Sequence, residues 1–522
     1  MPRQATPAGH AGRAVSLLPL AFAAGLALLS VTARVQQGAL LEAGILGAAT
    51  SLVLLHALLF AGLARHRAPA RRVSVVLRPQ HYVQALVQSS IFVYWGYYWA
   101  PIQDHLWLIA AQLLFAYGFD MLLSWSRREQ YILGFGPFPI IFSINLFLWF
   151  RDDLFYLQFV MIAVGFMGKE FVRWRRDGRL THIFNPSAFA LGLISLMLIA
   201  TGTTDLTWGR DIASQLTLAP HIYLFLFLTG LIVMYRFAIT LVAGAAAAVL
   251  FALSEIYAAV AGVPYFIDSD IPAAVFLGLH LLITDPSTSP RTPLGKTLFG
   301  ALYGLGVFGL YSLLGRLGVP TFYDKLLCVP LLNLSVIAID RVAHAIHTTR
   351  PWQYWFEDGV PRRVNLLHMG AWASLFLVMT LLGRTDGRHT GDSLPFWQGA
   401  CADGRAQACA RLLAITSTYC SDRSAWACND LGLHYRRGDI VAADARRARA
   451  YFSRACELRF QPACFNLLDD DGLYAAAPKA LDLRLLLREG GRNLVQMPEA
   501  ELLARACDHG WAFACAQRVS RR

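Results

Sequence analysis

The chain has 522 residues, of which 56% are hydrophobic and 15% are charged, and its formal net charge is +12. This composition is too apolar for an ordinary soluble protein and fits a polytopic membrane protein with one water-exposed part. The positive charge lies mainly in short arginine-rich loops between apolar stretches, which is typical of membrane proteins and argues against nucleic-acid binding.

Apolar stretches of roughly 17–25 residues, the length of a transmembrane helix, follow one another through the first three quarters of the chain. The first stretch is as long as a signal peptide, but it has no convincing cleavage site and a second stretch follows at once, so we expect a retained helix. The pattern predicts about thirteen helices, some of them short, at 14–33, 39–63, 82–101, 104–124, 131–150, 153–169, 185–201, 220–236, 238–260, 271–283, 296–314, 325–339 and 365–383.

Basic residues mark one side of this predicted membrane domain. Arginine and lysine cluster after the even-numbered helices, for example in 65–78 and 169–179, whereas loops after odd-numbered helices, such as 201–220 and 262–270, contain few of them. By the positive-inside rule this pattern predicts a cytoplasmic amino terminus and, with an odd number of helices, a carboxy-terminal part on the outer side. We therefore expect a multi-pass protein of a bacterial inner membrane with a periplasmic carboxy-terminal domain.

Eight of the nine cysteines follow the last predicted helix, whereas Cys328 lies in an apolar helix and is expected to be a small packing residue. The eight form four pairs with a common separation of eight positions, and two adjacent pairs repeat after 36 residues, a period typical of helix–turn–helix repeats. Regular pairing predicts disulfides and an oxidising compartment. Zinc is the alternative, although zinc pairs usually have about two to four intervening residues. The predicted bridges are Cys401–Cys409, Cys420–Cys428, Cys456–Cys464 and Cys507–Cys515.

The segment between the second and third pairs has a pattern of its own. Residues 431–456, LGLHYRRGDIVAADARRARAYFSRAC, resemble a Sel1-like repeat in the cysteine-rich form that occurs in secreted bacterial repeat proteins. This resemblance implies a small α-solenoid, and such solenoids present concave surfaces to protein partners.

We therefore expect an all-α polytopic membrane protein followed by a small disulfide-linked α-solenoid. The expected parts are amino-terminal transmembrane helices with a basic cytoplasmic loop (1–81), a membrane core (82–345), a cytoplasmic loop with the last transmembrane helix and a linker (346–395), and an extracytoplasmic repeat domain (396–522).

Three polar segments interrupt the apolar pattern of the core. The most informative is 280–306, HLLITDPSTSPRTPLGKTLFGALYGLG, in which Thr284-Asp285-Pro286 breaks an apolar helix. Hydroxyl groups and an acid beside the bilayer interior are costly, so such a segment usually lines a site. In 182–192, HIFNPSAFALG, the Asn-Pro step also fits a helix N-cap, an equally good structural explanation. In 332–340, LNLSVIAID, the mid-helix Asn333 most often bonds a neighbouring helix.

Together these segments carry a resemblance to a known family. The patterns T-D-P-x-T-S-P, T-P-x-G-K and F-G-x-x-x-G from residue 284, and F-N-P-S-x-x-x-x-G from residue 184, resemble the signatures of NqrB and RnfD. These are membrane subunits of the sodium-pumping NADH:quinone oxidoreductase and of the Rnf ferredoxin:NAD complex. The resemblance, strongest over 169–340, implies a flavin and two inverted five-helix repeats, similar in shape to urea and ammonium channels. The third to seventh and the eighth to twelfth helices would form these repeats.

The resemblance also implies how the flavin is held. The redox subunits of this family hold FMN covalently through a threonine in an S-G-[AT]-T motif, which this chain lacks. We therefore expect non-covalent FMN or riboflavin, and within the family the chain looks closest to the stand-alone, UnbU-like branch. The residues expected at the flavin site are Asn185, Pro186, Thr284, Asp285, Ser287, Thr288, Arg291, Lys296 and Asn333, of which the two cations would hold a phosphate or neutralise a reduced flavin. The alternative is a polar turn that only ends the helix and faces cytoplasmic water.

The function that follows from the resemblance is a membrane electron-transfer subunit, at most one part of an oxidoreductase complex. The chain has no Walker motif and no GxGxxG after a strand, so electrons are expected from a redox partner protein, and the repeat domain is expected to bind a periplasmic partner. The alternative is a transporter or channel-like scaffold of the same fold without a redox cofactor. Two histidine pairs, His344/His347 and His56/His280, are weaker candidates for haem or metal ligands.

Overall fold

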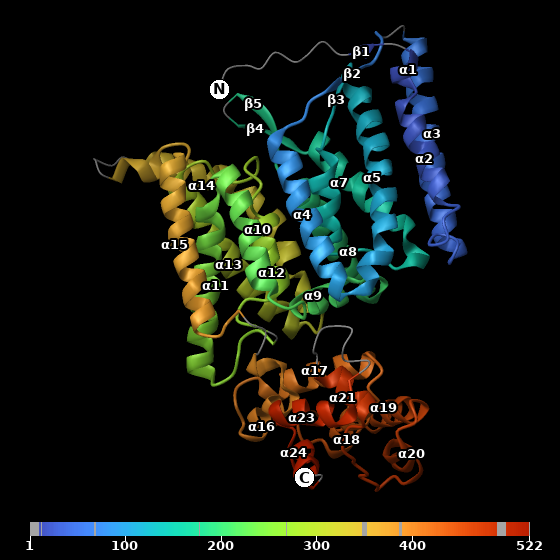
Figure 1. Cartoon of the computed structure of the whole chain (residues 1–522), viewed down its shortest axis with the longest axis vertical. Coiled ribbons are helices and arrows are strands. Elements are labelled where there is room, and N and C mark those ends of the chain that lie inside the picture. Colours follow the sequence, from blue (N-terminus) through green and yellow to red (C-terminus); the bar gives the residue numbers. More distant parts are fainter. Residues whose placement is uncertain are drawn as a thin grey trace. The chain divides into compact units, whose positions relative to one another are not determined.

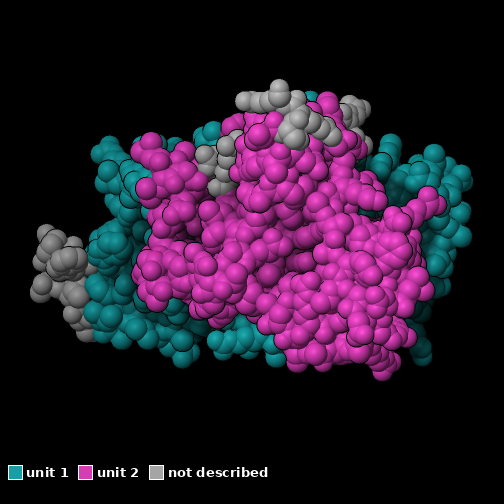
Figure 2. Space-filling model, turned by 90° about the horizontal axis from the view of Figure 1, so that it is seen from below, with its two compact units in different colours: residues 1–216, 222–250, 273–378 teal, residues 217–221, 251–272, 379–522 magenta. Residues whose placement is uncertain are grey.

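The computed structural model describes residues 10–11, 13–66, 69–176, 178–267, 269–346, 352–385, 389–487 and 497–520. Nearly all regular structure in these ranges is helical, which confirms the predicted all-α class (Figure 1). The chain divides into two compact units, coloured separately in Figure 2. Unit 1 contains residues 1–216, 222–250 and 273–378, and unit 2 contains residues 217–221, 251–272 and 379–522.

The apolar helices begin in unit 1. In chain order they are α1 (Arg13–Ser16), α2 (Leu18–Leu29), α3 (Ala39–Arg65), α4 (Pro79–Tyr98), α5 (Ala100–Arg127), α6 (Pro137–Asn145), α7 (Tyr156–Phe171), α8 (Pro186–Thr201), α9 (Gly209–Thr217), α10 (Ile222–Phe237), α11 (Thr240–Ala261), α12 (Ala273–Leu281), α13 (Pro293–Arg316), α14 (Asp324–Ala345) and α15 (Arg362–Leu381). Short 3-10 turns lie between some of them: η1 (Asp152–Leu154), η2 (Thr204–Leu206), η3 (Thr321–Tyr323) and η4 (Trp352–Phe356).

Among the described residues, segments outside these helices form two small sheets. Strands β1 (His10–Ala11), β2 (Arg72–Val75) and β3 (Gln130–Leu133) form one sheet in that order, in which β1 is antiparallel and β3 parallel to β2. Strands β4 (Arg173–Arg176) and β5 (Arg179–His182) form an antiparallel hairpin with Arg173 opposite His182. Its turn contains Gly178 at φ 73°, a left-handed conformation that favours glycine. The hairpin leads directly into α8, so it places its side chains beside the start of that helix.

Within the residues that the structure describes, six helices are long and apolar enough to cross a membrane: α3, α5, α11, α13, α14 together with η3, and α15. The bent pair of α9 and α10 adds a seventh if the two form one span. All the predicted apolar stretches contain a helix, but several of these helices are short, since a helix rises about 1.5 Å per residue and the hydrocarbon core is about 30 Å thick. The count of thirteen spans therefore stays a prediction.

Two of the short helices end before the end of their predicted apolar stretches. Helices α6 and α12 have nine residues each, and each is followed by non-helical chain, 146–151 and 282–292 respectively. Helix α6 is the third of the series α4–α8, and α12 is the third of the series from α10 to α14. At α12 the cause is local, because Pro286 disfavours a helical conformation of Asp285. The polar segment beginning at Thr284 therefore lies at the end of a broken helix.

Unit 2 contains eight shorter helices among its described residues. They are α16 (Leu394–Ala402), α17 (Ala408–Ser421), α18 (Ala425–Arg437), α19 (Ala445–Glu457), α20 (Gln461–Leu468), α21 (Ala480–Leu486), α23 (Glu499–Asp508) and α24 (Ala512–Ser520), with η5 (Thr390–Asp392) before the first. Four disulfides link α16 to α17, α17 to α18, α19 to α20 and α23 to α24, and they are the pairs predicted from the spacing: Cys401–Cys409, Cys420–Cys428, Cys456–Cys464 and Cys507–Cys515.

Each disulfide closes the same backbone corner. The residue three positions after the first cysteine has a left-handed φ in all four corners, with values of 68°, 72°, 64° and 87°. Its N–H donates to the carbonyl oxygen of the first cysteine, and the next N–H donates to the residue before that cysteine, which is a Schellman helix end. The four residues are Gly404, Arg423, Arg459 and Gly510. The constant separation of eight thus reflects one repeated helix–turn–helix corner.

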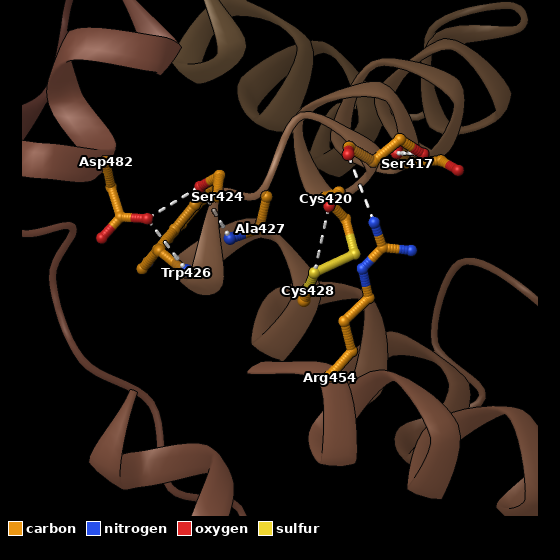
Figure 3. The surroundings of a disulfide bond; sticks show 9 residues. Ser417, Cys420, Ser424, Trp426, Ala427, Cys428, Arg454 and Asp482 are labelled. Atoms are coloured by element: carbon orange, nitrogen blue, oxygen red, sulfur yellow. Dashed lines mark hydrogen bonds between the residues drawn. A yellow bond between two sulfur atoms is a disulfide. The ribbon is translucent and has the colours of Figure 1, made fainter. Parts of the chain in front are cut away.

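A contact from later in the chain holds one of these corners, as Figure 3 shows. The Ser424 hydroxyl accepts from the Ala427 N–H at 3.3 Å and so caps α18. The Asp482 carboxylate on α21 accepts from the Ser424 hydroxyl at 2.9 Å and from the Trp426 N–H at 3.1 Å. These bonds join the repeated corner to a segment that does not share its cysteine pattern.

Residues 251–272, the end of α11 and the loop before α12, belong to unit 2. Val263 is buried in the apolar core of this unit. Arg405 donates to the Gly262 carbonyl at 3.1 Å, and Arg411 donates to the Tyr265 carbonyl at 2.9 Å. The expected repeat domain, 396–522, therefore shares one hydrophobic core with a loop between two apolar helices.

Candidate functional site

The start of α8 is built by Asn185 and Pro186. The Asn185 side-chain oxygen accepts from the Ser187 N–H at 3.1 Å, from the Ala188 N–H at 3.3 Å and from the Ser187 hydroxyl at 2.7 Å. Pro186 occupies the first helical position, where its missing N–H has no cost. Asn185 is thus the N-cap of α8, in agreement with the structural reading of this motif.

The three polar segments meet around Asn185. Its side-chain amide donates to the Leu282 carbonyl beyond α12 at 3.1 Å, and its backbone N–H donates to the Asn333 side-chain oxygen of α14 at 3.1 Å. The Asn333 amide in turn donates to the Thr288 carbonyl at 3.2 Å. Both asparagines are buried. These hydrogen bonds connect the beginning of α8, the middle of α14 and the loop after α12.

The loop residues satisfy the backbone of the broken helix. A helix end leaves four carbonyl groups without helical partners. At the end of α12, the Thr284 hydroxyl donates to the His280 carbonyl at 2.6 Å, and the Ser289 hydroxyl donates to the Ile283 carbonyl at 3.3 Å. Such bonds make a helix break tolerable inside a membrane protein.

Asp285 is the acidic group of this loop. Its carboxylate accepts from the Ser287 N–H at 2.9 Å and from the Thr288 hydroxyl at 3.3 Å. The Nε2 atom of His182, at the end of β5, lies 3.6 Å from the carboxylate oxygen that accepts from Thr288, and the His182 and Asp285 side chains are each 22% exposed. This pair remains reachable for a ligand.

A buried ion pair holds the same loop from the hairpin. The Arg176 guanidinium lies 2.5 Å from the Asp340 carboxylate at the end of α14 and donates to the Ser289 carbonyl at 3.0 Å. The other Asp340 oxygen accepts from the Arg291 N–H at 3.0 Å. The loop is therefore tied to both β4 and α14.

The two cations expected to face a flavin also contact other parts of unit 1. The Arg291 guanidinium lies 3.8 Å from Asp358, beyond α14 in the chain. The Lys296 ammonium is buried and donates to the Ala238 carbonyl at 3.0 Å, between α10 and α11. The convergent group thus consists of Asn185, Thr284, Asp285, Ser287, Thr288 and Asn333, with Pro186 at the start of the adjoining helix.

The weaker histidine candidates have separate surroundings. A His56 ring nitrogen bonds the Ser16 carbonyl at 2.9 Å, and His344 bonds Asp358 at 2.9 Å. His347 lies outside the described residues. Within the ranges that the structure describes, no group of three or more His, Cys, Asp or Glu side chains is arranged to hold a metal ion.

The sequence motifs did not identify several polar groups as site residues, although His182 begins the segment 182–192. His182 and Arg176 at the site are examples, and basic residues in a hairpin next to an apolar helix could have indicated them. A second buried set surrounds α6: the Asn145 side chain bonds His105 at 2.7 Å and Gln112 at 2.9 Å, and Gln158 donates to Gln112 at 3.2 Å. Polar residues within apolar stretches are the signal that could have identified this set.

Comparison of the chain with protein-family models, with curated proteins and with solved structures finds no match. The geometry of the site and its chemistry therefore have to carry the functional argument.

Proposed function

We propose that this chain is the membrane subunit of an electron-transfer complex, holds FMN or riboflavin non-covalently beside the loop after α12, and exchanges electrons with partner proteins. The observation that carries the proposal is the meeting of the three motif segments: Asn185 bonds both Leu282 and Asn333, and Asn333 bonds Thr288. These segments are far apart in the chain, and they are the ones that resemble the signatures of flavin-bearing membrane subunits.

The chemistry of the site fits such a ligand. A flavin ring has hydrogen-bond donors and acceptors along its polar edge and, when bound, supplies electron transfer in steps of one or two electrons. On the protein side, the Asp285 carboxylate and the His182 imidazole are both partly exposed, and they offer hydrogen-bonding groups to a ligand. Their role would be to orient the polar edge of the flavin.

The helix order supports the architecture that goes with this proposal. The series α4–α8 and α10–α14 would be two inverted repeats, because an odd number of spans reverses the direction of the second series. In each series the third helix is the nine-residue one. Broken helices that meet at the interface of two repeats are where membrane proteins of this type bind their ligands.

The proposal includes a membrane orientation. The amino terminus would be cytoplasmic, thirteen spans would cross a bacterial inner membrane, and residues 396–522 would be periplasmic. Four disulfides in that part fit an oxidising compartment. The repeated corners of the Sel1-like domain would form a solenoid that binds the periplasmic partner.

A second function is favoured by one specific observation. Each of the two helix series contains one short, interrupted helix, α6 in the first and α12 in the second. Discontinuous helices in both halves are typical of secondary transporters, which bind their substrate near the midplane. In this alternative the chain would be a transporter or channel-like scaffold without a redox cofactor.

The absorption spectrum of the purified full-length protein separates the two functions. The visible band of flavin supports electron transfer, and a colourless, correctly folded protein supports the transporter. The variants Asn185→Ala and Asp285→Ala should lose most of the bound flavin while the protein still inserts into the membrane.

The matched control is Asn365→Ala. Asn365 is also buried and also bonds across helices, to Thr240 at 2.9 Å and to the Met234 carbonyl at 3.1 Å, but none of its recorded bonds involves the motif segments. It should lose comparable stability and keep the flavin. If both site variants keep the full flavin content, or the control loses as much, these residues do not form the flavin site.

A further inference from the structure

Two buried polar atoms on facing helices lack partners in the described structure. They are the Nε2 atom of His280 on α12 and the indole Nε1 atom of Trp372 on α15. His280 is 1% exposed and Trp372 is 2% exposed, so bulk water does not reach either of them. A buried polar group without a hydrogen bond is rare and calls for an occupant or a functional reason.

The two atoms have complementary hydrogen-bonding roles. The other ring nitrogen of His280, Nδ1, lies 2.7 Å from the Phe276 carbonyl oxygen. Because a carbonyl oxygen can only accept, Nδ1 carries the hydrogen, and in the neutral ring Nε2 is then an acceptor. The indole nitrogen of Trp372 can only donate. One atom therefore needs a donor and the other needs an acceptor.

The rings that carry these two atoms belong to one aromatic cluster of residues from α10, α12 and α15, called the enclosure below. The centroids of the His280 and Trp372 rings are 5.9 Å apart, and the Phe276 ring lies 4.6 Å from the first and 6.1 Å from the second. Phe227 on α10 lies 5.8 Å from Trp372. Gly230, one turn later on α10, makes room for the imidazole, because a Cβ at this position would lie 2.0 Å from its Cδ2 atom.

We propose that this enclosure is a binding site for one small molecule that both donates and accepts hydrogen bonds, and that its resident is a single water molecule. The water accepts from the Trp372 N–H and donates to His280 Nε2. Two hydrogen bonds of about 2.9 Å each can span roughly 5 Å, which suits rings that are near each other but not directly bonded. Buried waters typically have two to four polar partners, and this site supplies two.

The water site adjoins the candidate functional site. The Thr284 hydroxyl donates to the His280 carbonyl at 2.6 Å, so the enclosure lies one helical turn before the polar loop. His280 then provides a hydrated hydrogen-bond acceptor, its Nε2 atom, beside that loop. This inference does not depend on flavin, because it rests only on side chains of α10, α12 and α15.

The test is nuclear Overhauser transfer from water to tryptophan N–H groups in the full-length protein, labelled with ¹⁵N-tryptophan and held in nanodiscs. The Trp372 resonance is identified by its loss in Trp372→Phe. It should show a water cross-peak, whereas the buried Trp397, whose N–H donates to the Gly391 carbonyl at 2.7 Å, should show none. If the Trp372 N–H has no water cross-peak, the site is dry and the proposal fails.

The histidine resonance provides an independent readout. Trp372→Phe keeps an aromatic ring but removes the donor. If the N–H binds the water, this variant should shift the ¹⁵N resonance of His280 Nε2 in protein labelled with ¹⁵N-histidine. An unchanged His280 resonance would overturn the proposal, because it would show that no water links the two rings.

Discussion

The ion pair of Arg176 and Asp340 provides the sharpest test of how the loop after α12 is held. Its charged atoms are 2.5 Å apart, and the two side chains are only 7% and 11% exposed. Removing one partner of a buried pair leaves an uncompensated charge and typically costs about 3–5 kcal/mol. Arg176→Gln and Asp340→Asn should each lower the free energy of unfolding by about that amount. The double variant should cost less than the sum by about 1–3 kcal/mol, because no unpaired charge remains.

Cys328 makes this measurement possible without an introduced cysteine. It is the free cysteine of the chain, it is 3% exposed, and it lies on α14, the helix that carries Asp340. A thiol-reactive fluorophore should react with Cys328 when unit 1 unfolds, whereas the cysteines of unit 2 do not react because they form disulfides. Arg175→Gln is the matched control, since Arg175 is the exposed neighbour of Arg176 in β4. The proposed role of the ion pair would be refuted if the two single variants lowered the free energy of unfolding by strictly additive amounts, or if Arg175→Gln lowered it equally.

Three further predictions concern unit 2 and its surroundings. Peptide mapping without reductant should show four local disulfides, and reduction should cost roughly 2–3 kcal/mol per bridge, whereas cross-links between pairs would contradict the repeated corner. Burial alone would lower the pKa of His389, but its hydrogen bond and attraction to Asp270 outweigh burial and raise that pKa above 6.5. Its stabilisation of unit 2 should therefore be full below about pH 6.5 and lost as the pH rises through the folded-state pKa, and His389→Gln should flatten this dependence in thermal unfolding. A carboxy-terminal alkaline phosphatase fusion should be active and a fluorescent-protein fusion dark, and the reverse pattern would place residues 396–522 in the cytoplasm.

Features that depend on near neighbours could be predicted from the sequence. The apolar stretches predicted the helices, because an apolar run has few stable arrangements besides a helix in a membrane-like environment. The cysteine spacing predicted the disulfides, because the distance between Cys420 and Cys428 is set by one Schellman corner of eight residues. The N-cap at Asn185 was also visible, since its partners are two and three residues away.

Features that depend on distant partners were decided only by the tertiary structure. Arg176 and Asp340 are 164 positions apart, and nothing local pairs them. The same holds for the hydrogen bond between Asn185 and Asn333 and for the contacts of Lys296 with Ala238 and of Arg291 with Asp358. It also holds for the assignment of residues 251–272 to unit 2 and the burial of Val263 in its core. A polar side chain in an apolar environment needs a hydrogen-bond partner. The sequence indicates that such a partner is needed but does not identify it. Which partner satisfies this need depends on how the helices pack.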